Sequence, residues 1–173
     1  YISKAIELGA SAIVLEHVPE GGISVPYIRV DSSRRALAQM AANYFDHPAD
    51  SMTMVGITGT NGKTTTTYLL KTILEAQGHT VGLIGTNQNM IGDEILPTER
   101  TTPESFELHK LFAQMRDAGC THVIMEVSSH SLVLDRVYGI EFTVGAFTNL
   151  TQDHLDFHKT MEAYRDAKAL LFH

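Results

Sequence analysis

The chain of 173 residues is long enough to bury a sizeable core, and its 43% hydrophobic and 19% charged residues are ordinary for a globular protein. Its net charge of −7 argues against a protein that wraps the backbone of a nucleic acid. No apolar run is long enough for a membrane span and the first residues lack the order of a signal peptide, so we expect no membrane insertion and a cytoplasmic location. Cys120, the single cysteine, excludes an internal disulfide and is expected in the core.

Apolar runs alternate with amphipathic stretches along the chain, which is the pattern of α/β architecture. The expected strands are residues 11–16, 27–30, 52–58, 80–86, 122–128 and 142–148. The expected helices are residues 1–10, 33–45, 63–77, 104–118 and 161–172. Buried strands followed by helices predict a mostly parallel sheet with helices on both faces, of the P-loop type.

Pro48 and its polar neighbours in DHPADS, residues 46–51, interrupt this pattern and indicate a domain boundary. Residues 1–47 are then the end of a smaller α/β domain, and residues 48–173 are the first part of a larger one. Because the chain opens without methionine and both ends lie within expected helices, we expect it to be a piece of a longer protein.

The segment GITGTNGKTTTT, residues 56–67, lies between an expected buried strand and a helix that begins at Lys63. The common phosphate loop, G-x-x-x-x-G-K-[ST], requires glycine where this chain has Ile57. A glycine-rich turn without a ligand is the alternative. Strand, loop, G-K-T and helix in this order favour a phosphate site.

The residues of this loop suit phosphate chemistry. Gly59 and Gly62 let backbone N–H groups turn toward phosphate oxygens, and the helix N-terminus adds partial positive charge. We expect Lys63 to reach the outer phosphates and Thr64 to place its hydroxyl on Mg²⁺.

The loop TGTNGKTTT resembles the ATP loop of the Mur ligases and their relatives, including the folylpolyglutamate synthetases, which dispense with the first glycine. Further motifs resemble, in order and spacing, the UDP-N-acetylmuramoyl-tripeptide synthetases (MurE type) of that family: ERTTPE (99–104), MEVSSHSL (125–132) followed by Arg136, TNLTQDHLDFH (148–158) and YRDAKALLF (164–172). Residues 1–47 resemble the end of the family's N-terminal UDP-binding domain. The resemblance implies that the C-terminal, amino-acid-binding domain is absent from this chain.

The resemblance implies an ATP-dependent amide ligase of peptidoglycan precursor synthesis in bacteria. Such an enzyme adds meso-diaminopimelate or L-lysine to UDP-N-acetylmuramoyl-L-alanyl-D-glutamate through an acyl phosphate, with ATP and Mg²⁺. Of the two amino acids, we favour diaminopimelate. Alternatives are a folylpolyglutamate synthetase, a regulatory P-loop module, although no N-K-x-D guanine motif occurs, and a non-catalytic nucleotide-binding fragment.

Glu126 is expected at the carboxyl end of a strand beside the loop, where a carboxylate can hold a hard cation; a water-facing glutamate is the alternative. The resemblance implies catalytic roles for Lys63, Glu126 and Lys168. It implies ATP contacts by Gly59, Thr60, Asn61, Gly62, Lys63, Thr64, Thr65 and Asn149. It implies substrate contacts by Thr101, Thr102, Ser128 and Arg136, and metal contacts by Thr64, Glu126, His154 and Lys168.

Lys168 would be a surface lysine by its pattern alone, but the resemblance implies that CO2 converts it to a carbamate. Burial lowers a lysine pKa, and the neutral amine can then add CO2 to give an anionic oxygen ligand. His154 and His158 are four residues apart, as in a zinc pair, but the chain has no H-E-x-x-H. The resemblance favours a magnesium role for His154 and a structural one for His158.

Overall fold

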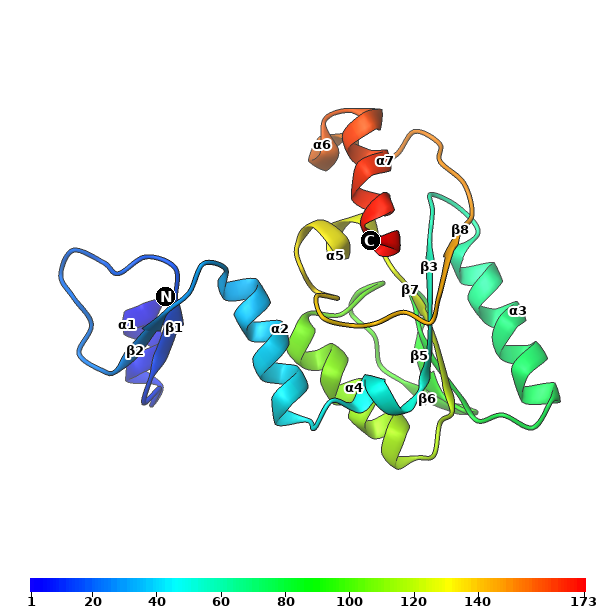
Figure 1. Cartoon of the computed structure of the whole chain (residues 1–173), viewed down its shortest axis with the longest axis horizontal. Coiled ribbons are helices and arrows are strands. Elements are labelled where there is room, and N and C mark those ends of the chain that lie inside the picture. Colours follow the sequence, from blue (N-terminus) through cyan, green and yellow to red (C-terminus); the bar gives the residue numbers. More distant parts are fainter.

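A six-stranded sheet of order β6-β5-β4-β7-β3-β8 forms the centre of the computed structural model, which describes residues 1–173 (Figure 1). Its strands are β3 (Thr53–Thr58), β4 (Val81–Ile84), β5 (Asn89–Ile91), β6 (Glu94–Leu96), β7 (His122–Glu126) and β8 (Val144–Phe147). Strands β4, β7, β3 and β8 run parallel, and β5 and β6 add an antiparallel hairpin at one edge. The predicted α/β fold with a mostly parallel sheet is confirmed.

The register of these strands brings their carboxyl ends together. Ile57 of β3 lies opposite Glu126 of β7, and Ile84 of β4 lies opposite Met125. On the other side of β3, Thr58 lies opposite Phe147 of β8. Loops that follow β3, β4, β7 and β8 therefore meet at one edge of the sheet, where ligands collect in open α/β folds.

Helices cover both faces of the sheet, with α3 on one face and α4 on the other (Figure 1). The helices are α1 (Ile2–Glu7), α2 (Ser33–Tyr44), α3 (Lys63–Ala76), α4 (Ser105–Asp117), α5 (Ser129–Val133), α6 (Leu155–His158) and α7 (Met161–Ala169), with 3-10 turns η1 (Pro48–Ser51) and η2 (Leu170–Phe172). Helices α5, α6 and α7 gather beyond the carboxyl ends of the strands, on the side of α4.

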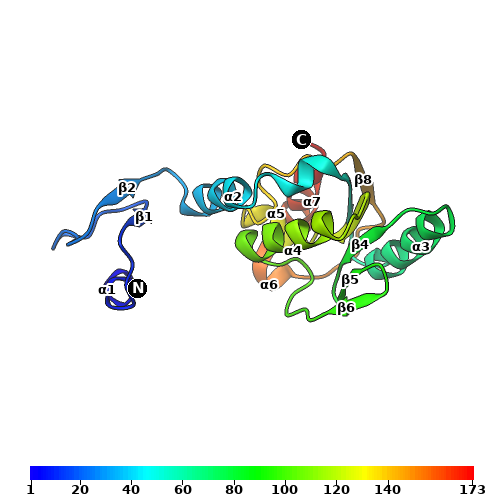
Figure 2. The same ribbon diagram turned by 90° about the horizontal axis from the view of Figure 1, so that it is seen from below.

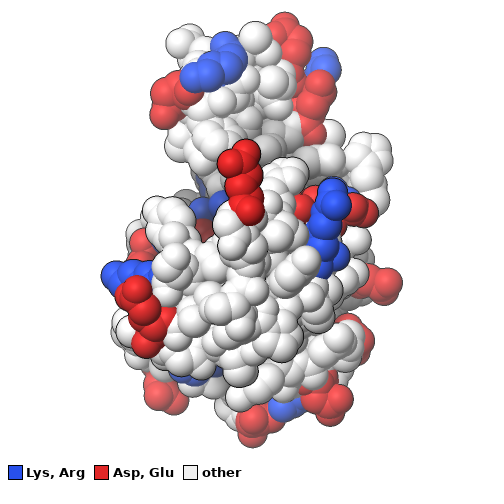
Figure 3. Space-filling model, turned by 90° about the vertical axis from the view of Figure 1, so that its left-hand side faces the viewer, with Lys and Arg blue, Asp and Glu red and all other residues white.

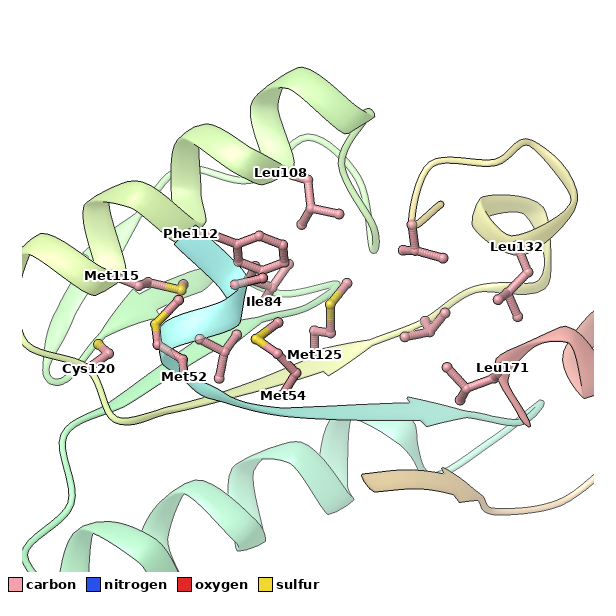
Figure 4. Close-up of a cluster of buried hydrophobic side chains, with 14 residues drawn as sticks. Met52, Met54, Ile84, Leu108, Phe112, Met115, Cys120, Met125, Leu132 and Leu171 are labelled. Atoms are coloured by element: carbon pink, nitrogen blue, oxygen red, sulfur yellow. The ribbon is translucent and has the colours of Figure 1, made fainter. Parts of the chain in front are cut away.

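The larger core lies between the sheet and α4 and is rich in methionine (Figure 4). Phe112 and Leu108 of α4 point onto Met54, Met125 and Ile84 of the strands. Cys120 is buried in this core, as predicted. A second cluster under α3 joins Val55, Ile57, Val81 and Ile124 to Leu70 and Leu74. The two clusters explain why the central strands read as continuous apolar runs.

The N-terminal residues form a small separate element made of α1 and the parallel strands β1 (Ile13–Leu15) and β2 (Tyr27–Arg29) (Figure 2). Helix α2 links this element to the large sheet and packs against α4. Rings of Tyr44, Phe45 and Phe106 contact one another there, and Arg116 Nη1 donates to the Phe45 carbonyl over 3.0 Å. The domain boundary at residues 46–51 stays a prediction.

Several short elements were not predicted from the sequence. They are the β5–β6 hairpin, η1, and the helices α5 and α6. The last predicted helix is α-helical only to Ala169 and ends in the 3-10 turn η2. His154 does not lie on a helix with His158, because it precedes α6 with a left-handed backbone of φ 52°.

Charged side chains lie in small separate groups on the face that Figure 3 shows. The net charge of −7 is therefore not gathered into one patch on that face. None of the helices combines the length and apolar character needed to cross a membrane.

Candidate active site

The segment 59–62 forms the loop between β3 and α3, as predicted. Gly62 precedes the helix with φ 86° and Gly59 has φ 140°, backbone conformations that favour glycine. Gly59 is also closely packed, because a Cβ there would lie 1.9 Å from Thr148 Oγ1. The first N–H groups of α3 have no partner within the helix, so the end of the loop offers donors to an anion.

Residues 148–151, which follow β8, form hydrogen bonds with Thr60 and Asn61 of the loop. The Thr60 N–H donates to the Asn149 carbonyl over 2.9 Å, and the Asn61 N–H donates to Asn149 Oδ1 over 3.0 Å. Asn149 Nδ2 and Thr148 Oγ1 both donate to the Asn61 carbonyl, over 2.9 and 2.7 Å. Asn149 thus shapes the loop by accepting hydrogen bonds from the Thr60 and Asn61 N–H groups. The N–H groups at the start of α3 remain available to a ligand.

Two lysines converge on one carbonyl oxygen of the loop. Lys63 Nζ donates to the Gly59 oxygen over 2.9 Å and to the Thr60 oxygen over 3.0 Å. Lys168 Nζ, from α7, donates to the same Gly59 oxygen over 3.0 Å. Both amines therefore lie against the backbone of the loop, at the Gly59 carbonyl.

Burial changes the acidity of both amines. Lys168 is 2% exposed, and desolvation, with Lys63 as a second cause, lowers its pKa to about 8. Its ammonium also lies 4.3 Å from the centre of the Tyr164 ring. Desolvation likewise lowers the pKa of Lys63, although Glu126 and Asp153 oppose the change. The expectation of a buried Lys168 with a lowered pKa is met by these contacts.

Glu126 ends β7 beside the loop and is 1% exposed. Its Oε1 accepts from Thr64 Oγ1 over 2.9 Å and from the Thr86 N–H over 3.0 Å, and its Oε2 accepts from Thr86 Oγ1 over 3.1 Å. The carboxylate packs directly against Gly85, which follows β4, because a Cβ there would lie 2.6 Å from Glu126 Oε1. Glu126 is not the water-facing glutamate of the alternative.

The oxygen donors of Thr64 and Glu126 fit a hard divalent cation. Glu126 is a buried carboxylate with only neutral hydrogen-bond donors, an arrangement that a cation would stabilise. No group of three or more His, Cys, Asp or Glu side chains in the structure is arranged to hold a metal. The fit therefore depends on hydroxyl and phosphate oxygens besides Glu126, and gives no support to zinc.

The structure does not bring every predicted metal residue together. His154 is exposed, lies 3.5 Å from Asp153 Oδ2 and contacts the His130 ring, and no hydrogen bond joins it to Thr64 or Glu126. His158 is buried with its Nε2 2.9 Å from Ser129 Oγ, which fits the expected structural role. Thr65 is exposed in the first turn of α3.

Hydrogen bonds link the predicted substrate residues to Glu126. Thr102 Oγ1 donates to the Glu126 carbonyl over 2.8 Å and accepts from the Ser128 N–H over 3.1 Å. Thr101 Oγ1 lies 3.0 Å from Thr86 Oγ1. Arg136 Nη1 donates to the Thr102 carbonyl over 3.2 Å. All four are thus joined to Glu126 through one hydrogen-bonded network.

Sequence reasoning missed Thr86, Thr148 and Tyr164, which hold Glu126, Asn61 and Lys168 in place. Thr86 could have been predicted from the sequence, because it closely follows β4 and the carboxyl ends of neighbouring parallel strands meet at one edge of the sheet. Tyr164 begins the motif YRDAKALLF, but the resemblance implied no role for it; its hydroxyl lies 3.3 Å from Thr60 Oγ1.

A phosphate loop between the buried parallel strand β3 and a helix, with a buried carboxylate on the neighbouring strand β7, places the chain in the class of P-loop α/β proteins. A family model described as the Mur ligase middle domain matches residues 57–173. The chain therefore belongs to the Mur ligase family.

Individual relatives agree with this assignment. The chain is 55% identical over 172 residues to the "UDP-N-acetylmuramoyl-L-alanyl-D-glutamate--2,6-diaminopimelate ligase 1" of Clostridium acetobutylicum, with 99% of this chain and 36% of that protein covered. A solved structure of a protein with the same name apart from the final numeral matches with a TM-score of 0.83 at 28% identity, over 99% of this chain and 34% of that one.

The Mycobacterium tuberculosis folylpolyglutamate synthase, complexed with ADP and AMPPCP, matches with a TM-score of 0.67 over 79% of this chain and 38% of that one. At 16% identity it shows the fold alone. The chain spans about a third of the length of these diaminopimelate ligases.

Proposed function

We propose that the chain is part of a bacterial cytoplasmic ligase that uses ATP to join meso-diaminopimelate to UDP-N-acetylmuramoyl-L-alanyl-D-glutamate. Residues 1–47 contribute to the UDP-substrate domain and residues 48–173 to the ATP domain. The observation that carries the proposal is the 2.9 Å contact between Thr64 of the loop and buried Glu126, in a chain 55% identical to a protein of that name.

The open amides at the start of α3 and the amine of Lys63 bind the phosphates of ATP in this proposal. Lys63 breaks its hydrogen bonds to the Gly59 and Thr60 carbonyls and moves to the γ-phosphoryl group. There it neutralises negative charge while the phosphoryl group is transferred to the substrate carboxylate. The resulting acyl phosphate is attacked by the amine of the incoming amino acid, and phosphate leaves. Mg²⁺ held by Thr64 and Glu126 would supply further charge neutralisation on the phosphates.

Lys168 serves as a carbamate in the same proposal. Its pKa of about 8 leaves part of the amine neutral near pH 7.5, and the neutral nitrogen adds to the carbon of CO2 with release of a proton. The product is a buried anion close to Lys63, the positive charge of which also lowers the pKa of Lys168. Reaction with ¹³C-bicarbonate should give a carbamate carbon signal that is lost in Lys168→Met.

The proposed activity is tested with the full-length enzyme by ADP release. Release should require the UDP-dipeptide and diaminopimelate together, and L-lysine or a folate with glutamate should not replace them. Lys63→Ala should abolish release, while Lys110→Ala, at an exposed position of α4, should leave it unchanged. A Lys63→Ala enzyme that releases ADP at the wild-type rate would refute the role of the loop.

A further inference from the structure

The rings of His79 and His122 lie in contact at the amino ends of the central strands. His79 lies in the segment between α3 and β4, and His122 is the first residue of β7. The two ring centroids are 4.4 Å apart, and the ring planes are inclined by 58°. Both residues are partly exposed, so a small ligand can reach the pair from solvent.

The backbone fixes the positions of these two residues, which are distant in the sequence. Strand β7 pairs in parallel with β4 from its first residue, His122. The Thr121 N–H donates to the Thr80 carbonyl over 2.9 Å, and the His79 N–H donates to the Leu74 carbonyl over 3.2 Å. The sheet and the end of α3 therefore hold the two imidazoles beside each other.

The hydrogen bonds of Thr121 assign the tautomer of His122. Thr121 Oγ1 donates to the Thr80 carbonyl over 3.4 Å, so this oxygen accepts from His122 Nδ1, which is 2.8 Å away. Nδ1 then carries the proton, and Nε2 keeps its lone pair. Histidines that bind metals commonly donate one ring N–H to such an outer partner. The His79 ring contacts the His122 ring and takes part in no hydrogen bond, so it also has a free nitrogen.

The spacing of the rings fits two ligands of one metal ion. Imidazole nitrogens bind such ions at roughly 2.1 Å, and two of them at about a right angle place their ring centroids about 4.6 Å apart. The observed 4.4 Å is within a small side-chain rotation of this value. A face-to-face stack would have nearly parallel planes, which the 58° inclination excludes.

The chemistry of the pair selects the class of ion. Two neutral nitrogens suit Cu²⁺, Ni²⁺ and Zn²⁺, whereas Mg²⁺ prefers oxygen ligands. No third His, Cys, Asp or Glu side chain completes the group, so water takes the remaining coordination positions. The pair is also separate from the candidate active site, because Glu126 lies at the opposite end of β7, about 13 Å along the strand.

We propose that His79 and His122 together bind one divalent transition-metal ion at the amino edge of the sheet. The ion links the segment after α3 to the first residue of β7. The inference does not depend on the proposed function, because metal binding is measured without ATP or substrates.

Cu²⁺ is the probe that tests the inference, because it binds nitrogen ligands most tightly among these ions. It is added at less than one equivalent to the untagged full-length enzyme, at about pH 7.5, where an ordinary imidazole is neutral. Pulsed EPR should show two imidazole ligands in the wild type and one in His79→Gln or His122→Gln. Each of these variants should bind Cu²⁺ about tenfold more weakly or worse, since the second imidazole of the pair binds intramolecularly.

Two controls accompany this measurement. His47→Gln should bind Cu²⁺ like the wild type, because His47 is exposed and pairs with Asn43 and Asp50 rather than with a second imidazole. An excess of Mg²⁺ should not displace the Cu²⁺, since the pair offers no oxygen ligand.

Two results would overturn the inference. One is a Cu²⁺ affinity that neither His79→Gln nor His122→Gln lowers. The other is a two-imidazole spectrum that survives both substitutions and is lost in His130→Gln, which would place the ion at the contacting rings of His130, His154 and His158. His79→Gln decides the matter if His122→Gln does not fold, because the His79 side chain makes no hydrogen bond that the fold could lose.

Discussion

Replacing Lys168 by methionine should stabilise the fold, even though the proposed function needs its amine. Methionine has a similar length and no charge to bury. The Gly59 carbonyl keeps a donor in the variant, because Lys63 also bonds to it over 2.9 Å. Loss of the lysine therefore leaves no buried acceptor without a partner.

The size of the effect follows from the pKa of Lys168. A fall from the ordinary value of 10.5 to about 8 corresponds to about 3 kcal/mol, at roughly 1.4 kcal/mol per unit. Because the folded-state pKa is the lower one, the unfolded chain binds more protons between pH 8 and 10.5, and wild-type stability rises with pH in that window. Below pH 8 the penalty is complete. The advantage of Lys168→Met should be about 3 kcal/mol at pH 7 and about 2 kcal/mol at pH 9.

Urea unfolding of both proteins at pH 7 and pH 9 measures this difference. The buffers should be free of bicarbonate, so that no carbamate forms on the wild-type amine. A variant no more stable than wild type at pH 7, or an advantage that does not shrink by pH 9, would refute the assignment of Lys168 as a buried, mostly protonated cation.

Three further substitutions probe the loop and the helix packing. Gly59→Ala should destabilise the fold by about 2 kcal/mol in urea unfolding, because its Cβ would meet Thr148 Oγ1; unchanged stability would contradict the packing described. Asn149→Ala should weaken ATP binding about tenfold in titration calorimetry, since the loop loses both side-chain contacts to Asn61; equal affinity would show that the loop keeps its shape alone. His109 is 3% exposed, neither ring nitrogen has a partner, and desolvation lowers its pKa, so its share of stability is lost as pH falls below about 6.5. His109→Leu should therefore gain about 1 kcal/mol at pH 7 and more at pH 5.5, and a gain that does not grow on acidification would refute this reading.

The large elements of the fold were predictable because their sequences repeat one simple pattern. Strands β3, β4 and β7 are buried on both faces and read as apolar runs, and α3 and α4 end just before Gly78 and Gly119. The β5–β6 hairpin was missed because its strands have three residues each, although the Gly92–Asp93 pair between them is a hairpin signal.

The candidate site was predictable in part. Spacing and context identified Lys63, Thr64 and Glu126, whose side chains the structure brings together around the loop. The ion pairs of Glu104 with Arg34 and Arg136 were beyond the sequence, because these partners lie 70 and 32 residues away along the chain and only the tertiary fold brings them together.

The free edge of β8 sets a practical condition on the unfolding measurements. β8 pairs with β3 on one side only, and Val144 and Phe147 are each 48% exposed. No lysine, proline or charged residue interrupts the run Val144–Phe147. In a preparation of these 173 residues alone, such an edge offers unpaired backbone groups to a second chain, a template for intermolecular strand addition. Unfolding should therefore be followed at several protein concentrations, because self-association of the native chain would make the midpoint concentration-dependent.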